Sequence, residues 1–225
     1  MARSATERLS FKVEVLSGDY ARTGADVIHV HLPVEGAVVI TGGTTARAIY
    51  GHLDPTRFDA LTVGFSDERC VPPDDDASNY RMANEAFLAR SDAKVLRMPG
   101  ELPPDEGARN YHAAIAPFAT GIELMLLGMG ADCHVGALFP DSPALGSDLY
   151  CAAVDRPDGL RGLTLTPPVM RGARKILLLV SGQSKADAVR RAVTGNEPPI
   201  ECPARLLAEH ADASFLLDDA AASSL

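Results

Sequence analysis

Short stretches rich in apolar residues alternate along the chain with segments whose apolar positions recur at helical spacing. The apolar stretches predict strands at residues 12–16, 37–41, 61–66, 122–127, 175–180 and 213–217. Helices are predicted at residues 19–32, 44–53, 78–89, 106–115 and 185–193. Several of the strands are continuously apolar, which is typical of strands buried on both faces. The pattern therefore predicts an α/β fold with a mainly parallel sheet and helices on both faces.

The chain is long enough to form one sizeable α/β core. It has 225 residues, of which 46% are hydrophobic, an ordinary share for a globular protein. Its prolines fall between the predicted elements, and no stretch is long enough to serve as a linker between domains. We therefore expect a single domain over residues 1–225.

The charge balance narrows the classes of ligand. The chain has 21 basic and 30 acidic residues, which gives a net charge of −9. This excess of acid argues against general affinity for nucleic acid or for an anionic membrane. An anionic small molecule is expected to bind only where basic side chains converge locally.

The cysteines and the start of the chain bear on its location. The four cysteines are widely spaced and form no Cys-x-x-Cys pair, so neither a zinc site nor a disulfide framework is predicted. Residues 1–11 are polar and charged, unlike a secretory signal, and the longest aliphatic runs are too short to cross a bilayer. We expect reduced thiols and a cytoplasmic protein without a metal site.

Polar groups follow four of the predicted strands directly. Ligands bind beyond the carboxyl ends of the strands in an open parallel sheet. The four segments are Gly42-Gly43-Thr44-Thr45, Asp67-Glu68-Arg69, Asp132 with His134, and Ser181-Gly182-Gln183-Ser184-Lys185. Their coincidence at one sheet edge predicts a binding site there.

Asp132 and His134 follow an apolar run that ends in two glycines. A histidine at such a rim is a natural general acid or base, because its pKa is ordinarily near neutrality and a neighbouring carboxylate tunes it. The alternative interpretation is a strand-to-helix turn whose polar residues only cap a helix. The Asp-x-His pair alone leaves both interpretations open.

The other three polar segments predict that the site binds an anionic ligand. Gly42 and Gly43 allow close backbone approach, and Thr44 is placed to cap a helix whose first amides point outward. A plain glycine turn is an equal alternative on local grounds. Lys185 at a helix start opposes the helix dipole, which suggests a phosphate counter-charge. Arg69 either binds a ligand or pairs with the acids that precede it.

Together these motifs resemble the 6-phosphogluconolactonase family. The similarity runs from about Lys12 to the acidic segment after Leu217, with the motifs in the family's order. The similarity rests on five motifs: the glycine turn with its threonines, Asp67-Glu68-Arg69 followed by Val71-Pro72 and Ser78-Asn79-Tyr80, residues 126–140, Leu163-Thr164-Leu165-Thr166-x-Pro168, and Gly182-x-x-Lys185-Ala186.

The resemblance implies hydrolysis of 6-phospho-D-glucono-1,5-lactone to 6-phosphogluconate, in the oxidative branch of the pentose phosphate pathway. It implies the Rossmann-like α/β fold shared with glucosamine-6-phosphate deaminase and a sugar-phosphate lactone as the ligand. The chemistry of lactone hydrolysis fits these residue types without a metal or cofactor, so none is expected. A monomer or weak homodimer is expected.

By the same resemblance, His134 is the general base and Asp132 orients it. The residues assigned to the substrate and its phosphate are Gly42, Gly43, Thr44, Thr45, Arg47, Asp67, Arg69, Arg161 and Lys185. Two positions depart from the family pattern. Cys133 replaces a glycine between Asp132 and His134, and the arginine usual before Leu163 falls on Gly162, which leaves Arg161 one position early.

Three alternatives remain. A deaminase would release ammonia, but its pattern has an Asn-Glu-Pro type segment after the histidine, where this chain has Ala137-Leu138-Phe139-Pro140. A non-catalytic sugar-phosphate-binding protein would bind without turnover. A Cys133 thiolate nucleophile is the third, although adjacent side chains seldom converge as a nucleophile and its base.

Overall fold

A seven-stranded parallel sheet forms the centre of the molecule in the computed structural model, which describes residues 11–225. The strand order is β1-β10-β9-β6-β2-β3-β5, and every neighbouring pair is parallel. The strands are β1 (Lys12–Val15), β2 (Gly36–Ile40), β3 (Leu61–Phe65), β5 (Lys94–Val95), β6 (Ile122–Gly128), β9 (Ile176–Val180) and β10 (Ala213–Leu217). The predicted parallel sheet is confirmed, and only the two-residue edge strand β5 was not predicted.

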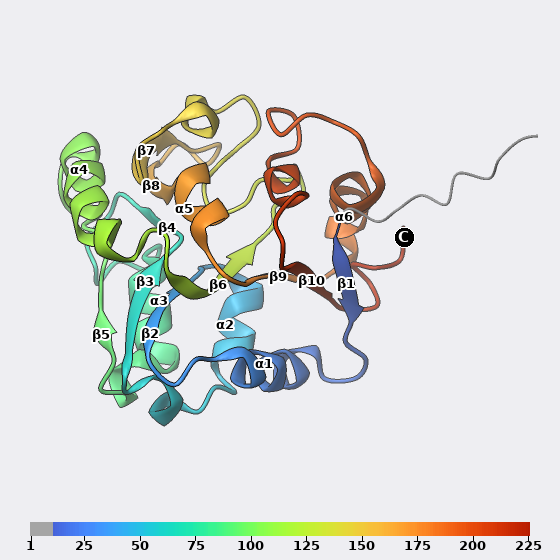
Figure 1. The fold of residues 1–225 in the computed structure, drawn as a ribbon, viewed down its shortest axis with the longest axis horizontal. Coiled ribbons are helices and arrows are strands. Elements are labelled where there is room, and N and C mark those ends of the chain that lie inside the picture. Colours follow the sequence, from blue (N-terminus) through green and yellow to red (C-terminus); the bar gives the residue numbers. More distant parts are fainter. Residues whose placement is uncertain (1–10) are drawn as a thin grey trace, which may run out of the picture.

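Helices cover both faces of this sheet, as predicted (Figure 1). One face carries α1 (Tyr20–His31), α2 (Thr44–Tyr50) and α3 (Asn79–Ala86), and the other carries α4 (Pro104–Ile115), α5 (Pro167–Gly172) and α6 (Ala186–Thr194). No helix in residues 11–225 is both long and apolar enough to cross a bilayer. The expectation about a secretory signal concerns residues 1–11, nearly all of which lie outside the described part.

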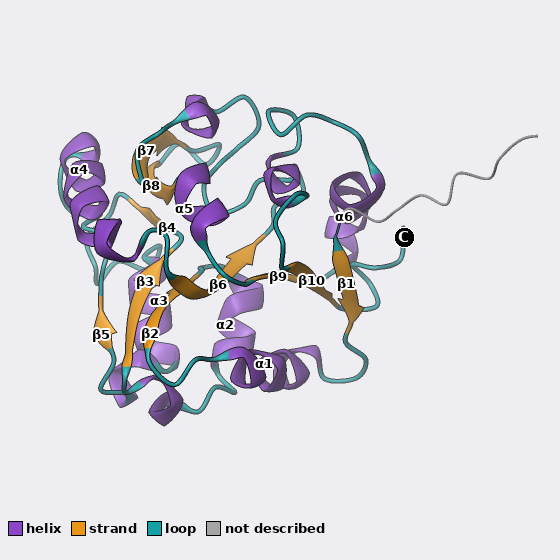
Figure 2. Cartoon of the chain, in the orientation of Figure 1, coloured by secondary structure: helices purple, strands orange, loops and turns teal. Residues whose placement is uncertain are grey.

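A second, three-stranded antiparallel sheet lies above the first (Figure 2). It consists of β4 (Asp67–Arg69), β8 (Arg161–Leu165) and β7 (Cys151–Asp155), in the order β4-β8-β7. The apolar pattern did not predict this sheet, because β4 is wholly polar and β7 contains only short side chains. It is joined to the main sheet where Leu165 N donates to Ser66 O at 2.8 Å.

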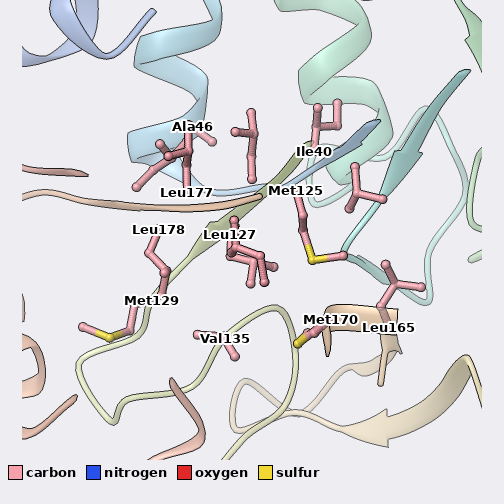
Figure 3. Close-up of a cluster of buried hydrophobic side chains, with 14 of the residues drawn as sticks. Ile40, Ala46, Met125, Leu127, Met129, Val135, Leu165, Met170, Leu177 and Leu178 are labelled. Carbon is pink, nitrogen blue, oxygen red and sulfur yellow. The ribbon is translucent and has the colours of Figure 1, made fainter. Parts of the chain in front are cut away.

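Aliphatic side chains of both sheets form one continuous core. Every residue of β9 is buried, which explains why its sequence contains no polar position. Figure 3 shows Leu127 and Met125 of β6 at the centre of a buried cluster, with Leu165 and Met170 closing it from the second sheet and α5. Val135, from the loop after β6, points into the same cluster, so the core holds this loop in place.

Three neighbouring strand ends are tied together through Thr41, which follows β2. Its hydroxyl accepts hydrogen bonds from Ser66 Oγ, after β3, at 3.2 Å and from the backbone N–H of Gly128, the last residue of β6, at 3.3 Å. The Tyr50 hydroxyl bonds both the N–H and the carbonyl of Thr41 at 3.0 Å. The carboxyl edge is therefore connected by side chains as well as by the sheet ladder.

The buried Glu68 carboxylate clamps β4 to the start of α3. It accepts from the N–H groups of Arg69, Asn79 and Tyr80 at 2.7–2.8 Å and from the Ser78 hydroxyl at 3.0 Å. Burial raises the pKa of Glu68, while these four donors favour its charged form and oppose that shift. The clamp fixes the first turn of α3 against the strand.

Glu68→Gln should lower the free energy of unfolding by about 1–3 kcal/mol, because the amide group turns a donor toward donors that lose their acceptor. Chemical denaturation measures the change. Glu14→Gln, on the exposed strand β1, is the control and should change stability by less than about 0.5 kcal/mol. Equal effects of the two substitutions would contradict the clamp.

Candidate functional site

A cavity of about 180 Å³ lies at the carboxyl ends of β9, β6, β2 and β3, which are four consecutive strands of the sheet. All four polar segments expected at this edge contribute to its wall: Gly42, Gly43, Thr44 and Thr45 after β2, Asp67 and Arg69 after β3, His134 after β6, and Ser181 and Lys185 after β9. The structure therefore brings together most of the predicted site residues.

The loop after β2 needs glycine for close approach. A side chain at Gly42 would run into the amide of Asn79, and Gly43 has a φ of +96° at the start of α2. Thr45 Oγ1 is hydrogen-bonded to Ser181 Oγ at 2.8 Å, which links this loop to the one after β9. The two loops form one continuous rim of the cavity.

His134 is held by Asp132 at the cavity wall. Nδ1 of His134 lies 2.6 Å from Oδ1 of Asp132, and the backbone N–H of His134 points to the same oxygen at 3.3 Å. Burial opposes ionisation of Asp132, but the hydrogen bonds from His134 outweigh it and hold the pKa of the carboxyl below its ordinary value. Asp132 is therefore a carboxylate at neutral pH, and it receives the Nδ1 proton of the ring.

The Asp132–His134 pair occupies the space above Gly130, where a Cβ atom would collide with both side chains. The imidazole ring also packs against Phe139, with ring centroids 4.5 Å apart. These contacts restrict the ring, so Nε2 is the nitrogen left for a ligand. The turn is thus more than a helix cap, since no helix follows His134 until residue 143.

Cys133 has the left-handed conformation that the family's glycine at this position suggests, with a φ of +72°. Its side chain is fully buried and does not line the cavity; Sγ points to Ala188 O at 3.5 Å. A hydrogen bond with the Cys202 thiol lowers the pKa of Cys133, against the effect of burial. The geometry does not support a Cys133 nucleophile, because the sulfur faces away from the ligand space.

Arg69 and Asp67 line the cavity from β4. Arg69 Nη1 donates to Ala77 O, while its Nε is buried without a partner among the described residues. Asp67 is held by Ser66 Oγ at 2.8 Å and by Asn79 Nδ2 at 3.2 Å. The Arg69 side chain thus forms no ion pair with the acids that precede it, and its guanidinium forms part of the cavity wall.

Lys185 precedes α6, at the end of a short 3₁₀ turn, and lines the cavity in no ion pair with a described residue. Its loop is anchored by Asp218, after β10, whose carboxylate accepts from Gly182 N at 2.9–3.0 Å. The acidic segment at the end of the sheet therefore has a structural use that sequence reasoning did not assign.

Two predicted arginines lie outside this cavity. Arg47 borders an adjoining hollow of about 300 Å³ and lies 3.6 Å from Glu85. Arg161 is half-exposed at the start of β8 and pairs with Asp155 at 3.0 Å. The structure thus does not bring Arg161 to the cavity, because its side chain alternates to the outer side of the hairpin.

Arg156 lines the cavity, and sequence reasoning missed it. It lies in the turn between β7 and β8, within the segment Arg156-Pro157-Asp158-Gly159. Those residues are a turn signal, which becomes informative only once the two flanking strands are recognised. Within residues 11–225, no three His, Cys, Asp or Glu side chains are grouped as a metal site would require.

The chain is similar to two related groups of enzymes. A family model described as glucosamine-6-phosphate isomerases/6-phosphogluconolactonase matches residues 20–216. A 6-phosphogluconolactonase of Mycobacterium tuberculosis is 33% identical over 213 residues, covering 85% of each chain. A glucosamine-6-phosphate deaminase of Rhodopirellula baltica is 40% identical over 209 residues, covering 82% of each.

A solved structure has the same fold. The crystal structure of 6-phosphogluconolactonase from Thermotoga maritima aligns with a TM-score of 0.84 at 22% identity. The alignment covers 93% of this chain and all of that one, 100%. The central parallel sheet with helices on both faces is therefore the fold of that enzyme.

Cys133→Gly should be more stable than Cys133→Ala by about 0.5–1 kcal/mol, because both remove the sulfur but only alanine keeps a Cβ at positive φ. Denaturant titration of the two variants measures the difference. An alanine variant as stable as the glycine variant would show that this backbone conformation carries no strain.

Proposed function

This chain belongs to the glucosamine-6-phosphate isomerase/6-phosphogluconolactonase family, and on that premise we propose that it hydrolyses 6-phospho-D-glucono-1,5-lactone to 6-phosphogluconate. The observation that carries the proposal is the 2.6 Å contact between Asp132 and His134 beside a cavity with cationic walls. This arrangement supplies a base next to an anion site, which a phosphorylated lactone requires.

His134 is the general base in this proposal. Its Nδ1 proton is held by Asp132, so Nε2 of the neutral ring accepts a proton from water. The water oxygen bonds to the lactone carbonyl carbon, and a tetrahedral intermediate forms. Its collapse breaks the bond to the ring oxygen, which takes the proton back from His134. Asp132 stays ionised and stabilises the imidazolium in between.

The phosphate side of the substrate is assigned to the cations of the cavity. Arg69 and Lys185 both line the cavity, and neither side chain forms an ion pair with a described residue. Thr44, on the loop after β2, lines the same cavity and adds a hydroxyl. These groups provide the local positive charge that a chain of net charge −9 otherwise lacks. Amides near Gly42 and Gly43 are proposed to face the developing oxyanion.

A deaminase is the second candidate, favoured by the 40% identity to the Rhodopirellula baltica relative. The segment after His134 argues against it. Residues 135–140 contain no carboxylate, and Val135 and Leu138 are fully buried, so this loop supplies no further acid beside His134. Release of ammonia from glucosamine 6-phosphate would decide for the deaminase.

We also propose a cytoplasmic enzyme that is a monomer or weak homodimer. All four cysteines are free thiols, which suits a reducing compartment. Light scattering at several protein concentrations measures the assembly state. The reaction would be the lactone-opening step of the oxidative pentose phosphate pathway.

Turnover should require the phosphate and survive chelation. Unphosphorylated glucono-1,5-lactone should have a kcat/KM at least about 10²-fold lower, because it loses the charge-assisted hydrogen bonds of the cavity. A pH-stat assay with freshly generated lactone, corrected for spontaneous hydrolysis, measures both rates. Loss of activity in EDTA that a divalent ion restores would contradict the proposal, as would equal rates on the two lactones.

His134→Ala should lower kcat by about 10²- to 10⁴-fold, the usual contribution of a general base. Lys185→Ala should chiefly raise KM, because its contact to the phosphate is similar in the ground and transition states. Cys133→Gly, beside His134 but facing away from the cavity, is the matched control and should keep its turnover. A folded His134 variant with near-normal kcat would remove this residue from the mechanism.

Binding of 6-phosphogluconate without turnover by the unaltered chain would indicate a non-catalytic protein.

A further inference from the structure

The side chain of Arg156 is nine-tenths buried although it starts from the tip of an exposed hairpin. The guanidinium lies over the ring of Phe139, 5.7 Å from its centroid, and Phe139 in turn packs against His134. The side chain therefore runs inward from the β7–β8 turn and reaches the cavity close to the proposed base. Neither the family pattern nor the composition of the turn assigns it a role.

The hairpin tip fixes the direction of this guanidinium. Asp158 accepts from Arg156 Nη2 at 2.9 Å and from Nε at 3.2 Å, and it also accepts from Leu160 N at 3.1 Å. The two-point contact holds one edge of the planar group. Nη1 is left on the opposite edge, 3.9 Å from Oδ2 of Asp67, which is within ion-pair range but beyond hydrogen-bond distance.

Gly162 provides the path along which Arg156 enters. A Cβ at residue 162 would lie 2.9 Å from Cδ of Arg156 and 3.3 Å from its Cγ, so the arginine stem fills the space of the absent side chain. Gly162 pairs with Arg69 across β8 and β4 and with Val154 across β8 and β7. The stem of Arg156 therefore packs over Gly162 of the second sheet, next to the position of Arg69.

We propose that Arg156 binds the substrate phosphate together with Arg69, through the Nη1 edge that Asp158 leaves open. The proposal rests on the proposed function for the identity of the ligand. Arg69 and Arg156 both line the cavity, and Arg156 Nη1 donates to no described residue. The stem of Arg156 packs at Gly162, the residue that pairs with Arg69 across the small sheet. A phosphate accepts several such donors at once. Asp158 is the positioning residue for this contact.

The first test measures the affinity of 6-phosphogluconate by calorimetry, together with KM and kcat for the lactone. Arg156→Gln should raise the Kd and the KM by about 10- to 100-fold, the range for a lost hydrogen bond to a charged group, with a smaller change in kcat. Arg174→Ala removes another ion-paired arginine, beside Glu123 and before β9, and should leave both constants unchanged. Unchanged Kd and KM in a folded Arg156→Gln variant would overturn the proposal.

The second test moves the guanidinium from residue 156, in the turn, to residue 162, in β8. Gly162→Arg alone should weaken binding, because its stem competes with Arg156 for one path. Arg156→Ala combined with Gly162→Arg should bind at least about tenfold better than Arg156→Ala alone, since the new stem follows the vacated path to the same rim. A merely structural Arg156 would gain nothing from this exchange, so a double variant no better than Arg156→Ala would count against a phosphate contact.

Asp158→Asn separates positioning from folding. It should raise KM for the phosphorylated lactone while kcat changes less, because it loosens the guanidinium without removing it. Turnover by the unaltered chain decides the proposed function, and the ratio of Kd values between Arg156→Gln and the unaltered chain decides the role of Arg156. If the unaltered chain binds 6-phosphogluconate without turnover, and Arg156→Gln abolishes that binding, the proposed lactonase activity is contradicted and the phosphate contact of Arg156 is supported.

Discussion

The hydrogen bonds around Thr41 hold the site together. Parallel strands ending at one edge bring loops into proximity, but the ladder does not fix the loops themselves. Thr41 joins the last residue of β6 to the segment after β3, and Tyr50 secures its backbone from α2. Burial raises the pKa of Tyr50, so its hydroxyl remains a donor at any physiological pH. The strand ends that lead to His134 and to Arg69 are thereby joined to each other through Thr41.

Much of the main sheet follows from local sequence. Continuous apolar runs such as residues 176–180 have no solvent-facing position, so they specify a strand covered on both sides. The glycines after such runs mark where the chain leaves the sheet, and that edge was identified correctly. The Asp132–His134 contact could also be predicted from the sequence, because two residues of a tight turn meet without help from distant segments.

The second sheet, and the positions of the residues that depend on it, could not be predicted from local sequence. β4 is stabilised by pairing with β8, nearly a hundred residues further along the chain, and its Asp-Glu-Arg sequence has no strand signal of its own. Glu68 is informative only once α3 is placed over it. Arg156 and Arg161 are five residues apart and chemically equal, and only the hairpin geometry shows which one turns inward.

The contact between Arg156 and Gly162 bears on how such chains are compared. The family pattern leads one to expect an arginine at residue 162, where this chain has glycine. In this chain the guanidinium of Arg156 lies beside residue 162: it starts from the turn between β7 and β8, and its stem fills the space that a side chain at 162 would take. The residues at the two positions consequently depend on each other: a side chain at 162 would collide with the stem of Arg156 unless residue 156 became shorter at the same time. Divergence in this hairpin should therefore be judged by the atoms that arrive at the rim, whatever their place in the chain.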